Sequence, residues 1–363
     1  PLSKNAPTLN TLRSMQHLRP RFAVCAAVFR IRSQLAFATH QFFQGRGFQY
    51  VHTPIITAAD CEGAGQMFQV TTLLPEGLQA AKLPATEQGA GGYSKDFFGK
   101  PVSLTVSGQL AVENFCHALC DVYTFGPTFR AEISHTSRHL AEFWMIEPEM
   151  AFAELEDNME CAEAFVKFCV QFLLDRAHSD LEFLDAKVER GLLERLQNIV
   201  SSSFARITYT EAVELLRAQK EVAFELEPVW GDDLCSAHER YLSEVVFKKP
   251  VIVTDYPYAL KAFYMKLNPG GKTVRAMDVL VPKIGELIGG SQREENLELL
   301  LKQMEDKHID KAELEWYLDL RKFGTVPHSG FGLGFERLVM LCTGIENIRD
   351  VIPYPRYVGN ALF

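Results

Sequence analysis

The chain has 363 residues, of which 47% are hydrophobic and 23% charged, as in an ordinary globular protein. Its formal net charge of −9 argues against a protein that coats nucleic acid without specificity, although it leaves room for a local basic groove. No apolar run reaches the roughly 18 residues that a membrane-spanning helix needs.

The start of the chain is polar, has no initiating Met and lacks the basic-then-apolar layout of a signal peptide. We therefore expect the given chain to be the interior of a longer gene product.

The eight cysteines form no CxxC pair and no Cys/His quartet typical of a metal site. This pattern predicts free thiols in a reducing compartment.

The first predicted element is a helix over residues 22–44, where apolar residues recur at helical spacing until Gly45 and Gly47 interrupt them. A short strand at 48–52 follows and stops before Pro54. Residues 74–100 are rich in Gly and Pro and show no sustained periodicity. We expect a long, mobile surface insertion there.

Short apolar runs then alternate with helical patterns to the end of the chain. The expected strands are 102–106, 123–132, 143–152, 250–255, 261–266, 276–281 and 286–288. The expected helices are 109–120, 154–176, 293–306 and 310–323, with a helical region of about 180–245 and a strand followed by a helix over 330–344. Runs of strands without regular βαβ alternation favour an α+β fold with an antiparallel β-sheet flanked by helices.

The first segment that suggests chemistry is Phe129-Arg130-Ala131-Glu132, followed by Arg138-His139 and then Phe143. An arginine on a strand, beside a loop that carries Arg and His, can grip several phosphate oxygens, and an aromatic ring offers a face to a purine. An exposed hairpin with a solvated charge cluster would show the same residues.

Two further segments stand out. In Gly-Phe-Gly-Leu-Gly-Phe-Glu-Arg, which ends at Arg337, glycine at every second position suits close backbone approach in a strand, although a tightly packed strand–helix corner fits as well. Asp278 and Glu286 lie on neighbouring predicted strands. Two carboxylates placed in this way can hold Mg²⁺ between phosphates, but an ion pair with Lys283 or Arg293 is an equal alternative.

Together, and in this order, these segments resemble the three signature motifs of class II aminoacyl-tRNA synthetases. Motif 1 is the helix and strand that end at Pro54, motif 2 is FRAE with its loop, and motif 3 is GLGFER. Longer strings are similar to bacterial-type asparaginyl-tRNA synthetases of the aspartyl/asparaginyl/lysyl subgroup, among them TPIITAADCEGAGQMF, LTVSGQLAVE, TSRHLAEFWMIEPEMAF and IGELIGGSQREE. The resemblance covers essentially the whole chain.

The resemblance implies that residues 1–363 form the class II catalytic domain, and that the N-terminal anticodon-binding OB domain of the family is absent from this chain. It implies ATP-dependent activation of L-asparagine to asparaginyl-adenylate, with Mg²⁺, and transfer to tRNA(Asn). It also implies a homodimer through the motif 1 region, no membrane association, and a location in the cytoplasm or, alternatively, an organelle.

The resemblance further assigns roles to individual residues. The catalytic residues would be Arg130, at the substrate carboxylate and the α-phosphate, and Arg337. The ATP-binding residues would be Arg130, Arg138, His139, Phe143, Glu286 and Arg337. Glu62 and Gln109 would lie at the α-amino group of the substrate, with Ser107 nearby. Glu147 and Arg293 would meet its side chain, and Asp278 and Glu286 would bind the metal.

The sequence leaves three alternatives to this function. An aspartyl enzyme would place a lysine where this sequence has Val112. A tRNA-independent ligase that makes asparagine from aspartate would use the same ATP site. A catalytically inactive binding module would be expected to lose Arg130, Glu286 or Arg337, and all three are present.

Overall fold

The computed structural model describes residues 7–59, 67–72, 93–220 and 222–362. The predicted site residue Glu62 and most of the predicted insertion at 74–100 lie outside these ranges. Among the described helices, none is both long and apolar enough to cross a membrane. The seven cysteines that the structure describes are all free, as predicted.

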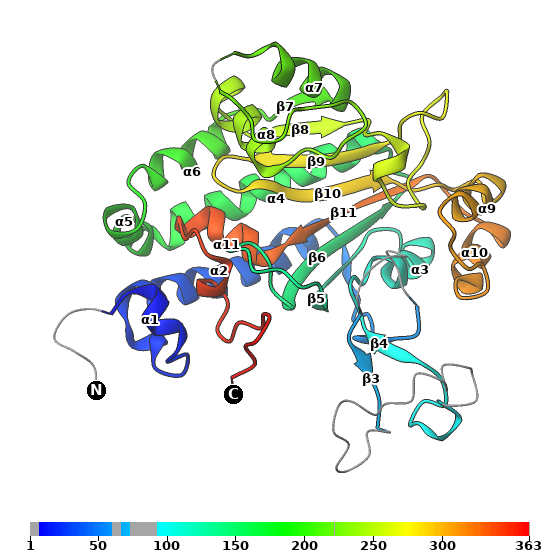
Figure 1. Ribbon diagram of the computed structural model, residues 1–363, viewed down its shortest axis with the longest axis horizontal. Helices are drawn as coiled ribbons and strands as arrows, with labels where there is room; N and C mark the ends of the chain where they lie inside the picture. Colours follow the sequence, from blue (N-terminus) through cyan, green and yellow to red (C-terminus); the bar gives the residue numbers. More distant parts are fainter. Residues whose placement is uncertain (1–6, 60–66, 73–92, 221, 363) are drawn as a thin grey trace.

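An eight-stranded sheet runs through the molecule in the order β1-β5-β6-β11-β10-β9-β8-β7 (Figure 1). The six central strands pair antiparallel, whereas the two edge strands β1 and β7 run parallel to their neighbours. The strand bounds are Gln49–Tyr50 (β1), Val122–Phe129 (β5), Glu142–Ala151 (β6), Ala205–Thr208 (β7), Val251–Thr254 (β8), Ala276–Val281 (β9), Gly285–Gln292 (β10) and His328–Gly334 (β11). The predicted antiparallel sheet flanked by helices is confirmed.

Two details of the predicted strands differ from the structure. Residues 261–266 form no ladder strand and make only an isolated bridge between Met265 and Arg293. The apolar run between Lys261 and Lys266 suggested a strand, but the buried Phe263 packs against residues of the helices Gln109–Leu119, Leu297–Asp306 and Glu315–Lys322. The region of about 180–245, predicted to be helical, also contributes the edge strand β7.

One face of the sheet carries the main hydrophobic core, formed with α2 (Ala23–Gly45), α4 (Leu155–Arg176) and α11 (Phe335–Thr343). Alternation along the central strands directs Phe331, Leu333 and Ile146 toward these helices. Helix α4 begins with a capping box, in which the Glu154 and Asp157 side chains satisfy free backbone N–H groups.

The same alternation places Gly330 and Gly332 on the other face of the sheet. There Gly330 is in register with Glu149 of β6, and the Met145 side chain lies next to Gly332. A Cβ at Gly330 would lie 2.3 Å from the Pro148 carbonyl oxygen, and one at Gly332 would lie 2.8 Å from Met145 Cε. Glycine is therefore required where β11 passes this face, which agrees with the close approach predicted for this segment.

The remaining elements surround the sheet. Helices α3 (Gln109–Leu119), α9 (Leu297–Asp306) and α10 (Glu315–Lys322) gather at one end of it, as Figure 1 shows. A small sheet of order β2-β4-β3 (Ile56–Thr57, Val102–Leu104 and Gln69–Val70) projects below α3. The others are α1 (Leu9–Arg13), α5 (His178–Lys187), α6 (Leu192–Ser201), α7 (Tyr209–Ala218) and α8 (Ser236–Arg240).

Candidate active site

A cavity of about 180 Å³ opens between the β5–β6 hairpin, β10 and the start of α11. Its lining includes all six residues predicted to bind ATP: Arg130, Arg138, His139, Phe143, Glu286 and Arg337. Segments more than 200 residues apart in the sequence therefore converge on one cavity.

Arg130 and Phe143 face each other across the mouth of the hairpin. The backbone N–H of Arg130 donates to the Ala141 carbonyl at 3.0 Å, which closes the loop between the strands. The Arg130 guanidinium carbon lies 5.4 Å from the centre of the Phe143 ring, within the range of a cation–π contact. The site thus offers a cation and an aromatic face side by side.

Arg337, in the first turn of α11, bridges to β10. Its Nη1 donates to the Glu286 carbonyl oxygen at 2.7 Å and to Glu286 Oε2 at 3.2 Å. Burial alone would raise the pKa of Glu286, but the charges of Arg337 and Lys261 outweigh it and the pKa is lowered. Glu286 is accordingly ionised at neutral pH.

The loop between β5 and β6 presents His139 and Arg138. His139 Nδ1 lies 2.7 Å from Thr136 Oγ1 and 2.9 Å from Ser134 Oγ, so the ring is oriented by the loop itself. Burial, followed by the charge of Arg337, lowers the pKa of His139, and burial with the nearby Arg240 lowers the pKa of Arg138. This end of the cavity is crowded with positive charge and suits an anion.

Asp278 and Glu286 converge over Gly289. A Cβ at Gly289 would lie 3.1 Å from Glu286 Oε1 and 3.4 Å from Asp278 Oδ1, so both carboxylates border the space that this glycine leaves open. The other oxygen of Asp278 accepts from Lys261 Nζ at 2.7 Å. Two carboxylate oxygens fit Mg²⁺, which prefers oxygen ligands and completes its shell with water and phosphate.

No group of three or more His, Cys, Asp or Glu side chains able to hold a metal occurs within the described ranges.

On the amino-acid side, Glu147 is buried and bound to the start of α3. Its Oε1 accepts from the Ser107 hydroxyl, and its Oε2 accepts from the Gly108 N–H at 2.9 Å. A Cβ at Gly108 would come within 2.5 Å of Thr53 Oγ1, so only glycine allows this approach. The structure thus brings together two of the predicted substrate residues, Ser107 and Glu147.

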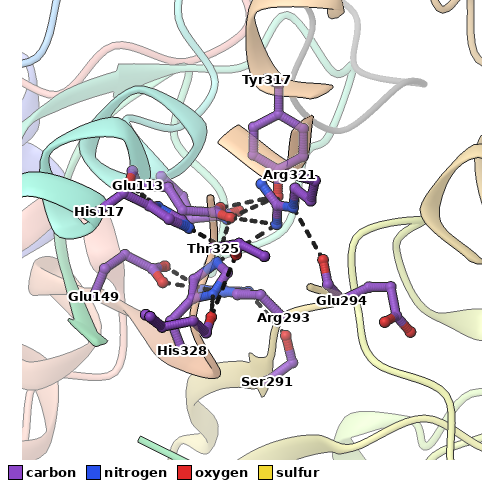
Figure 2. Close-up of polar contacts among 12 residues, drawn as sticks. Glu113, His117, Glu149, Ser291, Arg293, Glu294, Tyr317, Arg321, Thr325 and His328 are labelled. Carbon is purple, nitrogen blue, oxygen red and sulfur yellow. Dashed lines mark hydrogen bonds and ion pairs between the residues drawn. The ribbon is translucent and has the colours of Figure 1, made fainter. Parts of the chain in front are cut away.

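Arg293 pairs with Glu149 and not with Glu147. Its Nη2 and Nε donate to Glu149 at 2.5 and 3.3 Å, and Nη1 donates to Ser291 Oγ at 2.9 Å (Figure 2). Glu149 is fully buried, and burial raises its pKa, whereas the adjacent Arg293 lowers it and pairs with the ionised carboxylate. Sequence reasoning missed Glu149, whose signal was its position two residues after Glu147 on the same face of a strand.

Gln109 also has a partner that sequence reasoning missed. Its Nε2 donates to Oε2 of Glu113, one helical turn later in α3, at 2.8 Å. Glu113 in turn accepts from Tyr317 and Arg321 and lies against His328 (Figure 2). The i, i+4 spacing of Gln109 and Glu113 was the available signal.

The fold and the convergent motifs are those of a class II aminoacyl-tRNA synthetase. Residues 8–358 match the family model for class II tRNA synthetases of the D, K and N type, and the chain belongs to this family. The predicted family and fold are therefore confirmed.

Within this family, the chain is similar to asparagine–tRNA ligases. The chain is 57% identical to the asparagine–tRNA ligase of Clostridium botulinum strain Hall and 59% identical to that of Protochlamydia amoebophila, in both cases over 100% of this chain and 77% and 76% of the relative. The crystal structure of Pyrococcus horikoshii asparaginyl-tRNA synthetase with asparaginyl-adenylate superposes with a TM-score of 0.84 at 35% identity. The match covers 99% of this chain and 76% of the other.

Proposed function

We propose that this protein activates L-asparagine with ATP to form asparaginyl-adenylate and transfers the asparaginyl group to tRNA(Asn). The observation that carries the proposal is the convergence of residues from motifs 2 and 3 on one cavity. The names of the relatives at 57% and 59% identity support the same activity.

In the proposed reaction, the carboxylate of asparagine attacks the α-phosphorus of ATP, and pyrophosphate leaves. A ribose hydroxyl at the tRNA terminus then takes the acyl group and releases AMP. Arg130 would hold the carboxylate and the α-phosphate, where negative charge accumulates, and Arg138 and His139 would hold the outer phosphates. The adenine would lie between Phe143 and the guanidinium plane of Arg337.

Mg²⁺ bound at Asp278 and Glu286 would neutralise phosphate charge. The protein side chains need no covalent chemistry, since they act by positioning the reactants and by electrostatic stabilisation. The lowered pKa of Glu286 supports its part in this role, because an ionised carboxylate is the form that binds a cation.

The selectivity for asparagine over aspartate would follow from charge balance. Arg293 is already neutralised by Glu149, so it can donate to an amide oxygen without offering a net positive charge to a carboxylate. Glu147 would accept from the amide NH₂ and repel a carboxylate. Val112, where the aspartyl branch has a lysine, is fully buried and supplies no cation.

We further propose a homodimer through the motif 1 region. Phe37 on α2 is 56% exposed, and Ile55 and Ile56, just beyond the motif 1 strand, are 43% and 40% exposed. Obligate dimers commonly bury more than about 2,000 Å², largely apolar. A monomer in light scattering at micromolar concentration would contradict this part of the proposal.

The experiment that tests the function is pyrophosphate exchange with asparagine and with aspartate, followed by charging of tRNA(Asn). We expect exchange to depend on asparagine and to be much weaker with aspartate. Formation of free asparagine from aspartate and ammonia, without tRNA, would favour the ligase alternative instead.

We propose a reducing compartment, the cytoplasm or an organelle, because the described cysteines are free.

A further inference from the structure

A fully buried carboxylate, that of Glu113, binds the side chain of Gln109, which is predicted to contact the amino-acid substrate. Glu113 is 0% exposed, and its oxygens accept from Tyr317 Oη at 2.9 and 3.0 Å and from Arg321 Nη2 at 2.7 Å. His328 Nε2 lies 2.7 Å away, and Gln109 Nε2 donates at 2.8 Å (Figure 2 shows the first three partners). We call these five residues the Glu113 cluster.

The cluster decides which way the Gln109 carboxamide faces. Burial would raise the pKa of Glu113, but the charge of Arg321 overcomes it and the pKa is lowered, so the carboxylate is ionised and can only accept hydrogen bonds. Gln109 must therefore turn its NH₂ group toward Glu113. Because a carboxamide is planar, Oε1 then points away from the cluster.

The Glu113 cluster also links Gln109 to the residues that directly follow β10, where Arg293 lies. Arg321 Nε donates to the Glu294 carbonyl oxygen at 3.0 Å, and the Arg293 N–H donates to the His328 carbonyl oxygen at 2.9 Å. Two residues of the cluster thus hold the backbone on either side of the Arg293 side chain. The start of α3 and the end of β10 are consequently fixed relative to each other.

We propose that Glu113 is a positioning residue, which orients the Gln109 carboxamide so that its oxygen accepts a hydrogen bond from the α-ammonium group of the amino-acid substrate. This inference rests on the proposed function, since Gln109 is expected at that group. Without the negative charge at position 113 the carboxamide could turn over and present its NH₂ to the ammonium, which would repel it.

The test compares two ligands that differ only in the ammonium group. Glu113→Gln should raise the KM for asparagine in pyrophosphate exchange roughly tenfold and leave the KM for ATP unchanged. The inhibition constant of succinamate, which is asparagine without its α-amino group, should not change. In a Gln109→Ala background, Glu113→Gln should have no further effect on the KM for asparagine.

Two controls keep the result interpretable. Tyr317→Phe removes a hydrogen bond to Glu113 without touching Gln109, and should lower the melting temperature but not the affinity for asparagine. If Glu113→Gln does not fold, Glu113→Asp keeps the charge for Arg321 and His328 but shortens the reach to Gln109, and should give the same rise in KM.

Equal weakening of asparagine and succinamate, or additive effects of the substitutions at 109 and 113, would overturn the inference and leave Glu113 a purely structural residue. Failure of the proposed function would look different. In that case the unsubstituted protein would show no asparagine-dependent exchange at all.

Discussion

Removing the charge of Glu147 is the most direct probe of side-chain specificity. In Glu147→Gln, the new amide oxygen can still accept from the Gly108 N–H and the new NH₂ can donate to the Ser107 hydroxyl, so the local fold is expected to persist. What disappears is a charged acceptor for the NH₂ group of the substrate amide.

The size of the effect follows from that loss. A hydrogen bond to a charged group contributes about 1.5–3 kcal/mol, which corresponds to a decrease of roughly 10- to 100-fold in kcat/KM for asparagine. Arg293 keeps Glu149 as its counter-charge in this variant. Activation of aspartate should therefore become easier to detect for one reason, which is that Glu147 no longer repels the carboxylate of the aspartate side chain.

The assay is pyrophosphate exchange at equal concentrations of asparagine and aspartate, with thermal unfolding measured in parallel. Glu163→Gln, which removes a carboxylate that pairs with Lys167 within α4, is the matched control, and its asparagine-to-aspartate ratio should equal that of the unsubstituted protein. If Glu147→Gln lowers the melting temperature but leaves this ratio unchanged, Glu147 only binds the start of α3 and the specificity argument is wrong.

Three other predictions concern the same site. Arg337→Ala should raise the Kd for ATP by about tenfold in calorimetry, because a charged stacking contact is lost, and an unchanged Kd would remove Arg337 from the nucleotide site. The lowered pKa of His139 should rise when a triphosphate binds, so ATP should bind more tightly as the pH falls from about 7.5 to 6. Calorimetry in buffers of different ionisation enthalpy should detect the proton taken up, and His139→Asn should abolish it. Glu149→Gln should lower the free energy of unfolding by about 3–5 kcal/mol in urea titrations, since it leaves Arg293 buried without its partner. Glu163→Gln, in a more exposed ion pair, should cost less than about 1 kcal/mol.

Local patterns in the sequence determined much of this protein. The period of apolar residues predicted α2 and α4 to within a few residues, because a helix buries one face and the chain must supply it at regular intervals. The glycine alternation before Arg337 predicted a close backbone approach, since only glycine allows one. The motifs also indicated the family, because all three occur in the same order along one chain.

The tertiary structure decided which charges meet. Glu147 and Glu149 lie on the same face of β6, and only the pairing of β11 with both β10 and β6 makes Glu149 the partner of Arg293. Glu113 likewise meets Arg321, which is 208 residues later in the chain. Strand order and helix docking set such contacts, and they depend on the free energy of the whole fold, so no local pattern in the sequence contains them.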